Sequence, residues 1–357
     1  MNSKGGRAVQ KACAQGRRFT FYLLDGYTQH AFSSALEPLR LANAVMGRPY
    51  YSWRLLTRDG QPARSSCGMR MAADGALASE QDGLQELDRP HMTVVCGGSA
   101  VPPADGKAEG WLRMSRRGRV PIAGLAGGLY SLARSGVLDG RRCAVHWEHF
   151  PDFSERFFET KARQTAFEID GELYTCAGGN APFDMFLRIV EDDLGRDVAN
   201  RVCEVALSER VREAGERQRL PLQTRVGIDN RLLIDIIEQM EANIAEPLKL
   251  AEMTPSTGLS RRQVERLFKR EMGRSPKRYY LQMRLERANL FLVNSTLPVF
   301  EIAVACGFSS ASHFSRTYRE IYGCTPQHTR TAELERRRLP SDGKEMGRTV
   351  LQERRVA

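Results

Sequence analysis

The sequence contains no long apolar segment. Within its 357 residues, no apolar run approaches the roughly 18 residues that a membrane-spanning helix needs. Residues 1–18 carry five basic residues and none of the apolar stretch that marks a secretory signal, so we expect a basic, disordered tail there. Hydrophobic residues make up 41% of the chain and charged residues 27%, which is typical of a soluble globular protein. We therefore expect a cytoplasmic protein with no membrane partner.

Closely spaced cysteines are also missing. The eight cysteines form no Cys-x-x-Cys pair; they are Cys13, Cys67, Cys96, Cys143, Cys176, Cys203, Cys306 and Cys324. Such scattered spacing favours neither a zinc site nor a disulfide framework. We expect reduced thiols, most of them small core residues, and neither a metal nor a cofactor.

Acidic residues are too few to balance the basic ones, which leaves a net charge of +10. Residues 1–18 carry +5, residues 19–226 carry −1, residues 227–331 carry +4 and residues 332–357 carry +2. The excess therefore lies at the two ends and in the C-terminal third. A basic C-terminal region is compatible with a nucleic-acid partner, although charge alone does not identify one.

The chain is long enough for two domains, and the first part has the pattern of an α/β domain. Residues 19–208 alternate β-rich runs with helical stretches, which predicts a parallel sheet covered by helices on both faces. The expected strands are 19–24, 51–57, 92–96, 120–124, 143–147 and a hairpin over 166–179 that turns at Asp170-Gly171. The expected helices are 31–43, 107–118, 129–136, 181–193 and 197–214.

The second part is expected to be entirely helical. A polar, charged stretch over 209–226, broken by Pro221, predicts a linker. Residues 332–357, rich in Arg and Glu, are expected to form a charged, loosely ordered tail. Between them, residues 227–331 predict an all-α domain with helices over 229–243, 248–256, 260–272, 276–292, 298–305 and 310–322.

Two segments of this helical domain repeat one arrangement. Residues 248–273 and 297–323 each contain a short apolar helix, a turn at Gly258 or Gly307, a serine N-cap and a longer helix with one polar or basic face. This is the pattern of a helix–turn–helix, in which glycine takes the left-handed conformation of the turn. One copy could be an ordinary helical hairpin, but two copies joined by a helix over 275–293 favour DNA binding.

These segments resemble the double helix–turn–helix domain of AraC/XylS-type transcription regulators, on the stretches "GLSRRQVERLFKREMGRSPKRYYLQMRLERA" and "EIAVACGFSSASHFSRTYREIYGCTP". The resemblance implies that both recognition helices enter the major groove of promoter DNA, in a dimeric activator that works with RNA polymerase. Arginine suits bidentate reading of guanine, and serine at a helix N-terminus suits phosphate. The contacts that the resemblance implies are Arg261, Arg262, Gln263, Arg266, Ser310, Ser312, His313 and Arg316.

The stretch "IAGLAGGLYSLARSGVLDG", residues 122–140, lacks a nucleophile where one is expected. A short strand runs into a glycine-rich turn and a helix, the arrangement in which α/β hydrolases present Ser or Cys, but the turn holds Ala126. With "VVCGGSAV" and "FEIDGELYTCAGGNAPFDMFLRIV", this stretch resembles the flavodoxin-like, PfpI-like (class I glutamine-amidotransferase-like) domain of GlxA-type regulators. The resemblance implies that Ala126 replaces a catalytic Cys, and that His146 and Glu37 match its His and carboxylate partners.

Alanine has no lone pair and no acidic proton, so covalent catalysis through this position is excluded and we expect no enzyme. We interpret the domain as a sensor with a pocket at the carboxyl ends of the strands, where open α/β sheets bind ligands. The resemblance implies a small nitrogenous effector such as a quaternary amine or an amino acid. The expected ligand-binding residues are Glu37, Ala126, Gly127, His146, Trp147, Cys176, Gly178 and Gly179.

Alternatives remain open for several of these residues. His146 and Trp147 are equally compatible with structural roles, Glu37 with a charge near the start of a helix, and residues 176–179 with a plain tight turn. The competing function is a hydrolase or amidase that uses another nucleophile, such as Cys96 or Cys176.

Overall fold

The chain divides into two compact units, residues 1–218 and 219–357. The computed structural model describes residues 16–80, 89–208, 211–219, 222–255, 258–295 and 297–338. Most of the two expected tails lies outside the described residues. Each unit has hydrophobic cores of its own, and each is described separately below.

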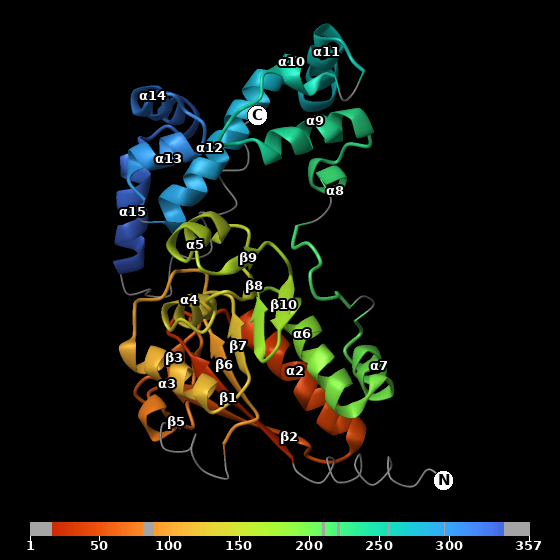
Figure 1. The fold of residues 1–357 in the computed structure, drawn as a ribbon, viewed down its shortest axis with the longest axis vertical. Coiled ribbons are helices and arrows are strands. Elements are labelled where there is room, and N and C mark those ends of the chain that lie inside the picture. Colours follow the sequence, from red (N-terminus) through yellow and green to blue (C-terminus); the bar gives the residue numbers. More distant parts are fainter. Residues whose placement is uncertain are drawn as a thin grey trace. The chain divides into compact units, whose positions relative to one another are not determined.

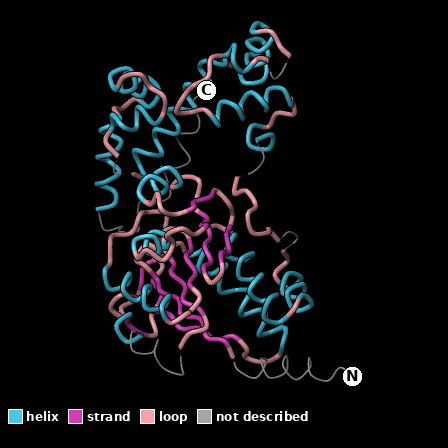
Figure 2. Tube along the Cα trace, in the orientation of Figure 1, coloured by secondary structure: helices cyan, strands magenta, loops and turns pink. Residues whose placement is uncertain are grey.

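A seven-stranded sheet forms the centre of the first unit (Figures 1 and 2). Its strand order is β10-β11-β7-β6-β1-β2-β5, and each neighbouring pair is parallel except the β10–β11 hairpin at one edge. The strands are β1 (Arg17–Leu23), β2 (Tyr51–Thr57), β5 (Gly75–Ala76), β6 (Met92–Cys96), β7 (Ile122–Leu125), β10 (Phe167–Asp170) and β11 (Leu173–Cys176). The expected α/β architecture is confirmed.

Helices cover both faces of this sheet because its strands are apolar on both sides. On one face α2 (Gln29–Met46), α6 (Ala181–Leu194) and α7 (Arg196–Val205) pack on a core that includes Phe19 and Phe21 of β1. On the other face α3 (Gly106–Arg117) and α4 (Gly128–Arg134) pack on a core that includes Tyr22. The period of two along β1 therefore assigns alternate side chains to different cores.

One expected strand does not belong to the main sheet. The 143–147 run forms β8 (Arg142–Ala144), which pairs with β9 (Lys161–Arg163) in a separate two-stranded sheet. Strand propensity predicted the strand but not its partner, because pairing is set by distant segments. Elements of the first unit that the sequence did not predict are β3 (Ala63–Arg64), β4 (Arg70–Met71), β5, η1 (Leu77–Glu80), α5 (Phe150–Arg156) and β9.

The last helix of this unit is shorter than expected. It was predicted to reach residue 214, but α7 ends at Val205. Leu207 adopts the left-handed conformation with φ 54°, and the N–H of Ser208 donates to the carbonyl oxygen of Cys203 at 3.0 Å. This backbone pattern stops the helix and redirects the chain.

The second unit is helical, as expected. Its first helix, α8, lies inside the predicted linker, and its last, α15, continues past the predicted domain end at residue 331. The helices are α8 (Leu222–Val226), α9 (Arg231–Ala242), α10 (Leu250–Met253), α11 (Arg261–Met272), α12 (Pro276–Asn294), α13 (Val299–Ala305), α14 (Ala311–Tyr322) and α15 (Pro326–Arg338).

The long helix α12 joins two small cores. Tyr280 near its start belongs to the core formed with α9, α10 and α11, whereas Leu285, Ala288 and Phe291 belong to the core formed with α13 and α14. Because the two cores lie on different sides of α12, its apolar residues do not form a single stripe. The unit is thus a pair of helical modules on one shared helix (Figure 1).

Candidate nucleic-acid interface and ligand site

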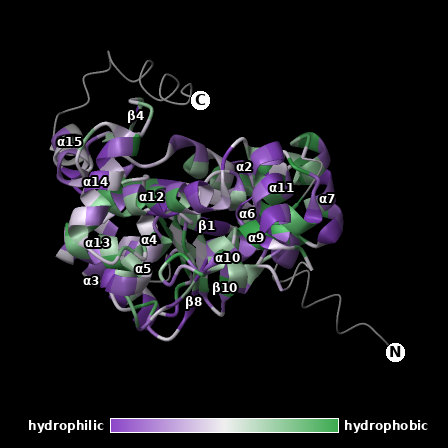
Figure 3. Cartoon of the chain, turned by 90° about the horizontal axis from the view of Figure 1, so that it is seen from above, coloured by the Kyte–Doolittle hydropathy of each residue, from purple (hydrophilic) through white to green (hydrophobic). Residues whose placement is uncertain are grey.

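The first module positions α11 through its caps and a narrow apolar stripe. The Ser260 hydroxyl accepts from the N–H of Gln263 at 3.4 Å, and the Gln263 side-chain oxygen accepts from the N–H of Ser260 at 2.8 Å, which together form a capping box. Val264, Leu267 and Phe268 are buried in the module's core. The remaining helix surface is hydrophilic and outward-facing, so α11 carries both kinds of residue in Figure 3.

The second module repeats this design in α14. The Ser310 hydroxyl caps the helix by accepting from the N–H of His313 at 3.2 Å. Phe314, Thr317 and Tyr318 are buried. Helix α14 ends at Gly323, just as α11 ends at Gly273, and both glycines have positive φ. Two similar helices with polar outer faces are therefore presented by two separate cores.

The turn before α14 is held in place by contacts within the unit. Gly307 has φ 72°, and a Cβ there would lie 2.6 Å from the Pro247 ring. Arg284 of α12 donates to the carbonyl oxygens of Cys306 at 2.8 Å and Gly307 at 2.5 Å. Its guanidinium also lies 4.3 Å from the centre of the Phe308 ring. Arg284 therefore fixes the turn that sets the direction of α14.

All the residues expected to contact DNA are exposed on the two recognition helices or at their N-caps. Several of them also have structural contacts, among them Arg316, whose guanidinium lies 3.9 Å from Glu320. Gln263 and Ser310 take part in the caps, the Arg261 guanidinium lies 3.0 Å from Glu265, and the His313 ring packs on Phe308. These contacts orient the N-terminal ends of both helices, where helix–turn–helix proteins read bases.

The turn expected to hold a nucleophile keeps its strained backbone although it carries alanine. Ala126 follows β7 and has φ 50°, a conformation that is uncommon for a residue with a side chain. Its N–H donates to the carbonyl oxygen of Cys176 at 3.0 Å, and the N–H of Gly127 donates to that of Gly98 at 3.0 Å. These two N–H groups are therefore already hydrogen-bonded within the fold.

Close backbone packing fills the space beside this turn. A Cβ on Gly128 would lie 2.2 Å from the Val95 carbonyl oxygen, and a Cβ on Gly98 would lie 2.1 Å from that of Gly26. Only glycine permits such an approach. The glycines of this region therefore let three loops meet closely at the carboxyl edge of the sheet.

The structure brings two turns of the expected ligand site into contact. A Cβ on Gly178 would lie 3.2 Å from the Cβ of Ala126, so the two turns that follow β7 and β11 touch. Gly178 and Gly179 both have positive φ, and the N–H of Gly178 lies 3.3 Å from the Cys176 sulfur.

Glu37 is a residue of helix α2. It lies two turns into α2, about 12 Å along the axis from the helix start. Both of its carboxylate oxygens are bonded by the Arg40 guanidinium, at 2.8 and 2.5 Å, and these bonds lower the pKa of Glu37. In the structure, Glu37 therefore takes part in an ion pair within α2.

His146 and Trp147 lie in the loop after β8. The His146 ring accepts from the N–H of Glu148 at 3.3 Å, and its burial lowers the pKa, so the ring is neutral at physiological pH. The N–H of Trp147 donates to the Gln218 side-chain oxygen at 2.8 Å. This loop is therefore tied to the last residue of the first unit, a contact that the sequence did not indicate.

The two cysteines proposed as alternative nucleophiles are buried. Cys96 and Cys176 are 1% and 0% exposed, and burial raises the pKa of both thiols, that of Cys176 to about 12. A thiol with such a pKa carries almost no thiolate at neutral pH, and the thiolate is the nucleophile. In the described part of the chain, no three His, Cys, Asp or Glu side chains form a group that could hold a metal ion, and no helix is long and apolar enough to span a bilayer.

Comparison with known proteins assigns both units to families. Residues 253–332 match the helix-turn-helix domain family and residues 19–192 match the DJ-1/PfpI family. The HTH-type transcriptional regulator GbdR of Pseudomonas aeruginosa is 36% identical over 314 residues, which cover 88% of this chain and 84% of that protein. The chain belongs to the GlxA-type HTH transcriptional regulators.

Two more relatives of this regulator agree in length and architecture. The HTH-type transcriptional regulator CdhR of Pseudomonas aeruginosa is 37% identical over 316 residues, 87% of this chain and 91% of that protein. The HTH-type transcriptional regulator GlxA of Rhizobium meliloti is 36% identical over 313 residues, 87% and 94% of the two chains. The predictions of a DNA-binding transcription regulator, with an AraC-type C-terminal domain and a PfpI-like N-terminal domain, are confirmed.

Proposed function

We propose that this regulator is an activator whose DNA-binding unit is controlled by a small nitrogenous metabolite, a quaternary amine or an amino acid, bound in the first unit. It works in the cytoplasm, where the chromosome is, as a homodimer that contacts RNA polymerase. The observation that supports this function best is the combination of two exposed, capped recognition helices with a PfpI-like turn in which Ala126 replaces the nucleophile.

The first unit acts as a sensor and not as an enzyme. Ala126 supplies no nucleophile, and the buried thiols of Cys96 and Cys176 stay protonated. The purified protein should therefore hydrolyse neither amides nor peptides, and an amidase rate that disappears in Cys96→Ser or Cys176→Ser would favour the hydrolase alternative.

The DNA contacts are proposed to come from the N-terminal halves of α11 and α14. Arg261, Arg262 and Arg266 carry positive charge on the exposed face of α11, and Arg316 does so on α14. Arginine reads guanine through paired hydrogen bonds, whereas Ser312 and the helix N-termini suit phosphate oxygens. Gln263, Ser310 and His313 complete the proposed interface, with Gln263 and Ser310 also serving as caps.

Mobility-shift titrations test this proposal on a duplex selected from a random library by the wild-type protein. Arg266→Ala and Arg316→Ala should each weaken binding to that duplex by about 1–3 kcal/mol, because each removes a base contact. Binding to random DNA at the same salt concentration should change less. Arg270→Ala is the matched control, since Arg270 lies in the last turn of α11 beside Glu271. Equal losses on both duplexes would show that the two arginines do not read bases.

A further inference from the structure

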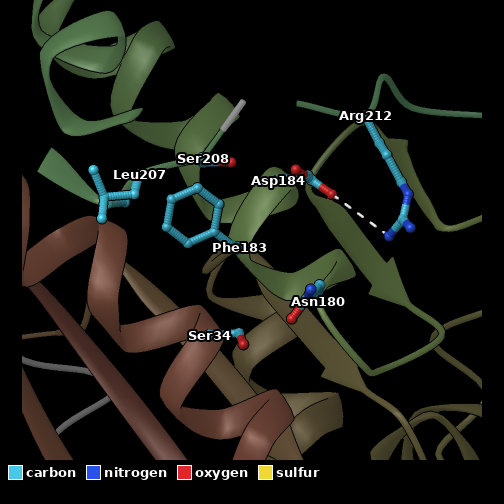
Figure 4. A pocket seen from close by; sticks show the side chains of 8 residues that line it. Ser34, Asn180, Phe183, Asp184, Leu207, Ser208 and Arg212 are labelled. Atoms are coloured by element: carbon cyan, nitrogen blue, oxygen red, sulfur yellow. Dashed lines mark ion pairs between the residues drawn. The ribbon is translucent and has the colours of Figure 1, made fainter. Parts of the chain in front are cut away.

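A cavity of about 340 Å³ lies in the first unit beside the start of α6 (Figure 4). Ser34 of α2 and the first turn of α6 form one wall, with Asn180, Phe183 and Asp184. Residues 206–208 and Arg212, which follow α7, form the other. The cavity directly follows the Cys176–Gly179 turn along the chain, and its volume is within the range of small-molecule sites.

Among the described residues that line the cavity, Asp184 and Arg212 carry opposite charges. The Asp184 carboxylate lies 4.0 Å from the Arg212 guanidinium, and their side chains are 6% and 36% exposed. Figure 4 marks this ion pair with a dashed line. A charge-assisted hydrogen bond between such groups is shorter, about 2.7–2.9 Å. The Asp184 and Arg212 groups therefore face each other at a distance longer than that of a charge-assisted hydrogen bond.

The wall formed by α2 and α6 is fixed. The His30 Nε2 atom lies 2.6 Å from the Asn180 side-chain oxygen, which joins the starts of α2 and α6. The Phe183 ring lies between Leu207 and Asn180 in Figure 4 and supplies an apolar surface. This wall offers a carboxylate and an aromatic ring, groups that bind a cationic nitrogen.

The other wall continues into the segment that leads to the second unit. After Arg212, the N–H of Gly215 donates to the Phe167 carbonyl oxygen at 3.1 Å, and the N–H of Ala166 donates to that of Glu216 at 2.7 Å. Residues 211–218 therefore add to the edge of the sheet at β10, and we call this segment the connector. Its last residue is Gln218, where the first unit ends.

Gln218 anchors the end of the connector. Its side-chain amide donates to the carbonyl oxygens of Val145 at 2.6 Å and Thr165 at 2.7 Å. Its side-chain oxygen accepts from the N–H of Trp147 at 2.8 Å. One side chain thus makes three hydrogen bonds to the backbone, and a shift of the connector would break them.

We propose that this cavity binds a small zwitterion, whose carboxylate pairs with Arg212 and whose cationic nitrogen pairs with Asp184, and that the connector transmits its binding to the DNA-binding unit. A ligand that carries both charges can pair with both groups. A simple cation would be repelled by Arg212, and a simple anion would be repelled by Asp184. The inference rests on the proposed function, in which the first unit senses an effector. It moves the ligand site from Glu37 and the Ala126 turn to the start of α6.

The ligand would act by separating two groups that now face each other. Arg212 would turn from Asp184 toward the ligand carboxylate, and its backbone is part of the connector. A ligand shifts a conformational equilibrium only by its difference in affinity for the two states. Here the ligand's affinity differs between two positions of the connector, because the contact between the ligand carboxylate and Arg212 depends on where the connector lies.

Calorimetric titration of the full-length protein tests the site. The probes are the twenty standard amino acids and glycine betaine, with choline lacking the carboxylate and acetate lacking the cation. At least one zwitterion should bind, while choline and acetate should not. Asp184→Asn and Arg212→Gln should each weaken that binding at least tenfold. Arg188→Gln is the matched control, because Arg188 is an exposed residue of α6 paired with Glu191.

Two results would overturn the site. Either no zwitterion binds the wild type, or the one that binds has unchanged affinity for both Asp184→Asn and Arg212→Gln. Because Asp184 is buried, its variant is compared with the wild type by thermal unfolding. Arg212, which is more exposed, keeps the test valid if Asp184→Asn does not fold.

Gln218→Ala tests the connector separately. This variant should bind the zwitterion within twofold of the wild type, but its affinity for the selected duplex should no longer change when the zwitterion is added. If the duplex affinity of the wild type does not respond to the bound zwitterion, effector control is wrong while the site stands. If wild type and Gln218→Ala respond equally, the role of the connector is wrong.

Discussion

At the scale of single residues, glycines determine how closely the loops of the sensor unit meet. Gly128 has no room for a side chain, because its Cβ would lie 2.2 Å from the Val95 carbonyl oxygen and 3.2 Å from the N of Gly97. Backbone atoms cannot move aside as a flexible side chain can. A glycine in the sequence shows only that no side chain restricts the backbone there. In the structure, the absence of a side chain at Gly128 allows the backbone of Val95 and Gly97 to approach closely.

Gly128→Ala should therefore destabilise the first unit by more than 3 kcal/mol, on the order of the largest single-substitution effects. Chemical denaturation followed by tryptophan fluorescence measures this change. The matched control is Gly171→Ala, whose Cβ would meet open space. Since Gly171 has φ 64°, that variant should lose only about 1 kcal/mol. Similar losses in both variants would contradict the steric argument.

A half-buried histidine should make the first unit sensitive to acid. His91 lies 2.8 Å from the Arg17 guanidinium and packs on Phe19, and burial together with Arg17 lowers the pKa of His91 to about 4. The unfolded chain takes up a proton near pH 6.5, but the folded chain does so only near pH 4. Stability is therefore lost as the pH falls from about 6.5 to about 4.

His91→Gln should remove this loss of stability, because the glutamine side chain can accept a hydrogen bond from Arg17 and does not titrate. Between pH 7 and pH 4, the free energy of unfolding should fall by about 1–2 kcal/mol more in the wild type than in the variant, after allowance for the partial exposure of His91. Asp193, whose pKa burial raises to about 6, acts in the opposite direction but is present in both proteins. Urea titrations at several pH values give the difference, and parallel curves would contradict the assignment.

At the scale of secondary-structure elements, α12 does more than connect two helix–turn–helix modules. Arg284, near its middle, bonds two carbonyl groups of the turn before α14 and stacks on Phe308. The Tyr318 hydroxyl of α14 donates to the Asn289 side chain of α12 at 2.7 Å. The direction of the second recognition helix is therefore set by side chains of α12.

Arg284→Ala should destabilise the second unit by about 1–3 kcal/mol, because two carbonyl groups lose a charged donor. It should also weaken binding to the selected duplex, although Arg284 is placed away from the DNA contacts. Arg284→Lys should recover only part of the loss, since an ammonium cannot form the same two bonds and stack. Full recovery with lysine would show that the charge alone matters. Mobility-shift titration and urea unfolding measure the two effects.

The last helix shows why some elements were missed. Residues 332–357 were expected to form a charged tail, yet α15 extends to Arg338. Its sequence is almost entirely polar, so no apolar period marked it. The Thr329 hydroxyl lies 3.2 Å from the Tyr318 hydroxyl and 3.3 Å from the Cys324 sulfur, and these contacts join α15 to the second module.

At the scale of the whole molecule, each unit has its own cores. Phe186 is fully buried between Phe19 and Phe21 in the first unit, and Leu292 is 1% exposed in the second. Calorimetry should therefore show two transitions. Phe186→Ala should lower only the transition of the first unit, by about 3–5 kcal/mol, and Leu292→Ala only that of the second, by about 2–5 kcal/mol. One transition that both variants shift would show that the units unfold together.

The sequence by itself determined the features that depend on neighbouring residues. The β-rich runs that alternate with helical stretches, and the Asp170-Gly171 hairpin, predicted the sheet. The serine caps and the glycine turns predicted the two helix–turn–helix modules and the faces of α11 and α14. Ala126 in the glycine-rich turn predicted the absent nucleophile. These features are local because backbone conformation, caps and amphipathic faces are set within a few residues.

Only the tertiary structure decided what lies next to the connector. Asp184 faces Arg212 across 28 positions of sequence, and Gln218 bonds Val145 across 73. The charged stretch after α7 has the composition of a solvated linker. The sequence does not show whether a polar side chain there bonds water or the backbone of a distant segment. Pairing between distant segments depends on the packing of the whole unit, and that packing forms the cavity at the start of α6.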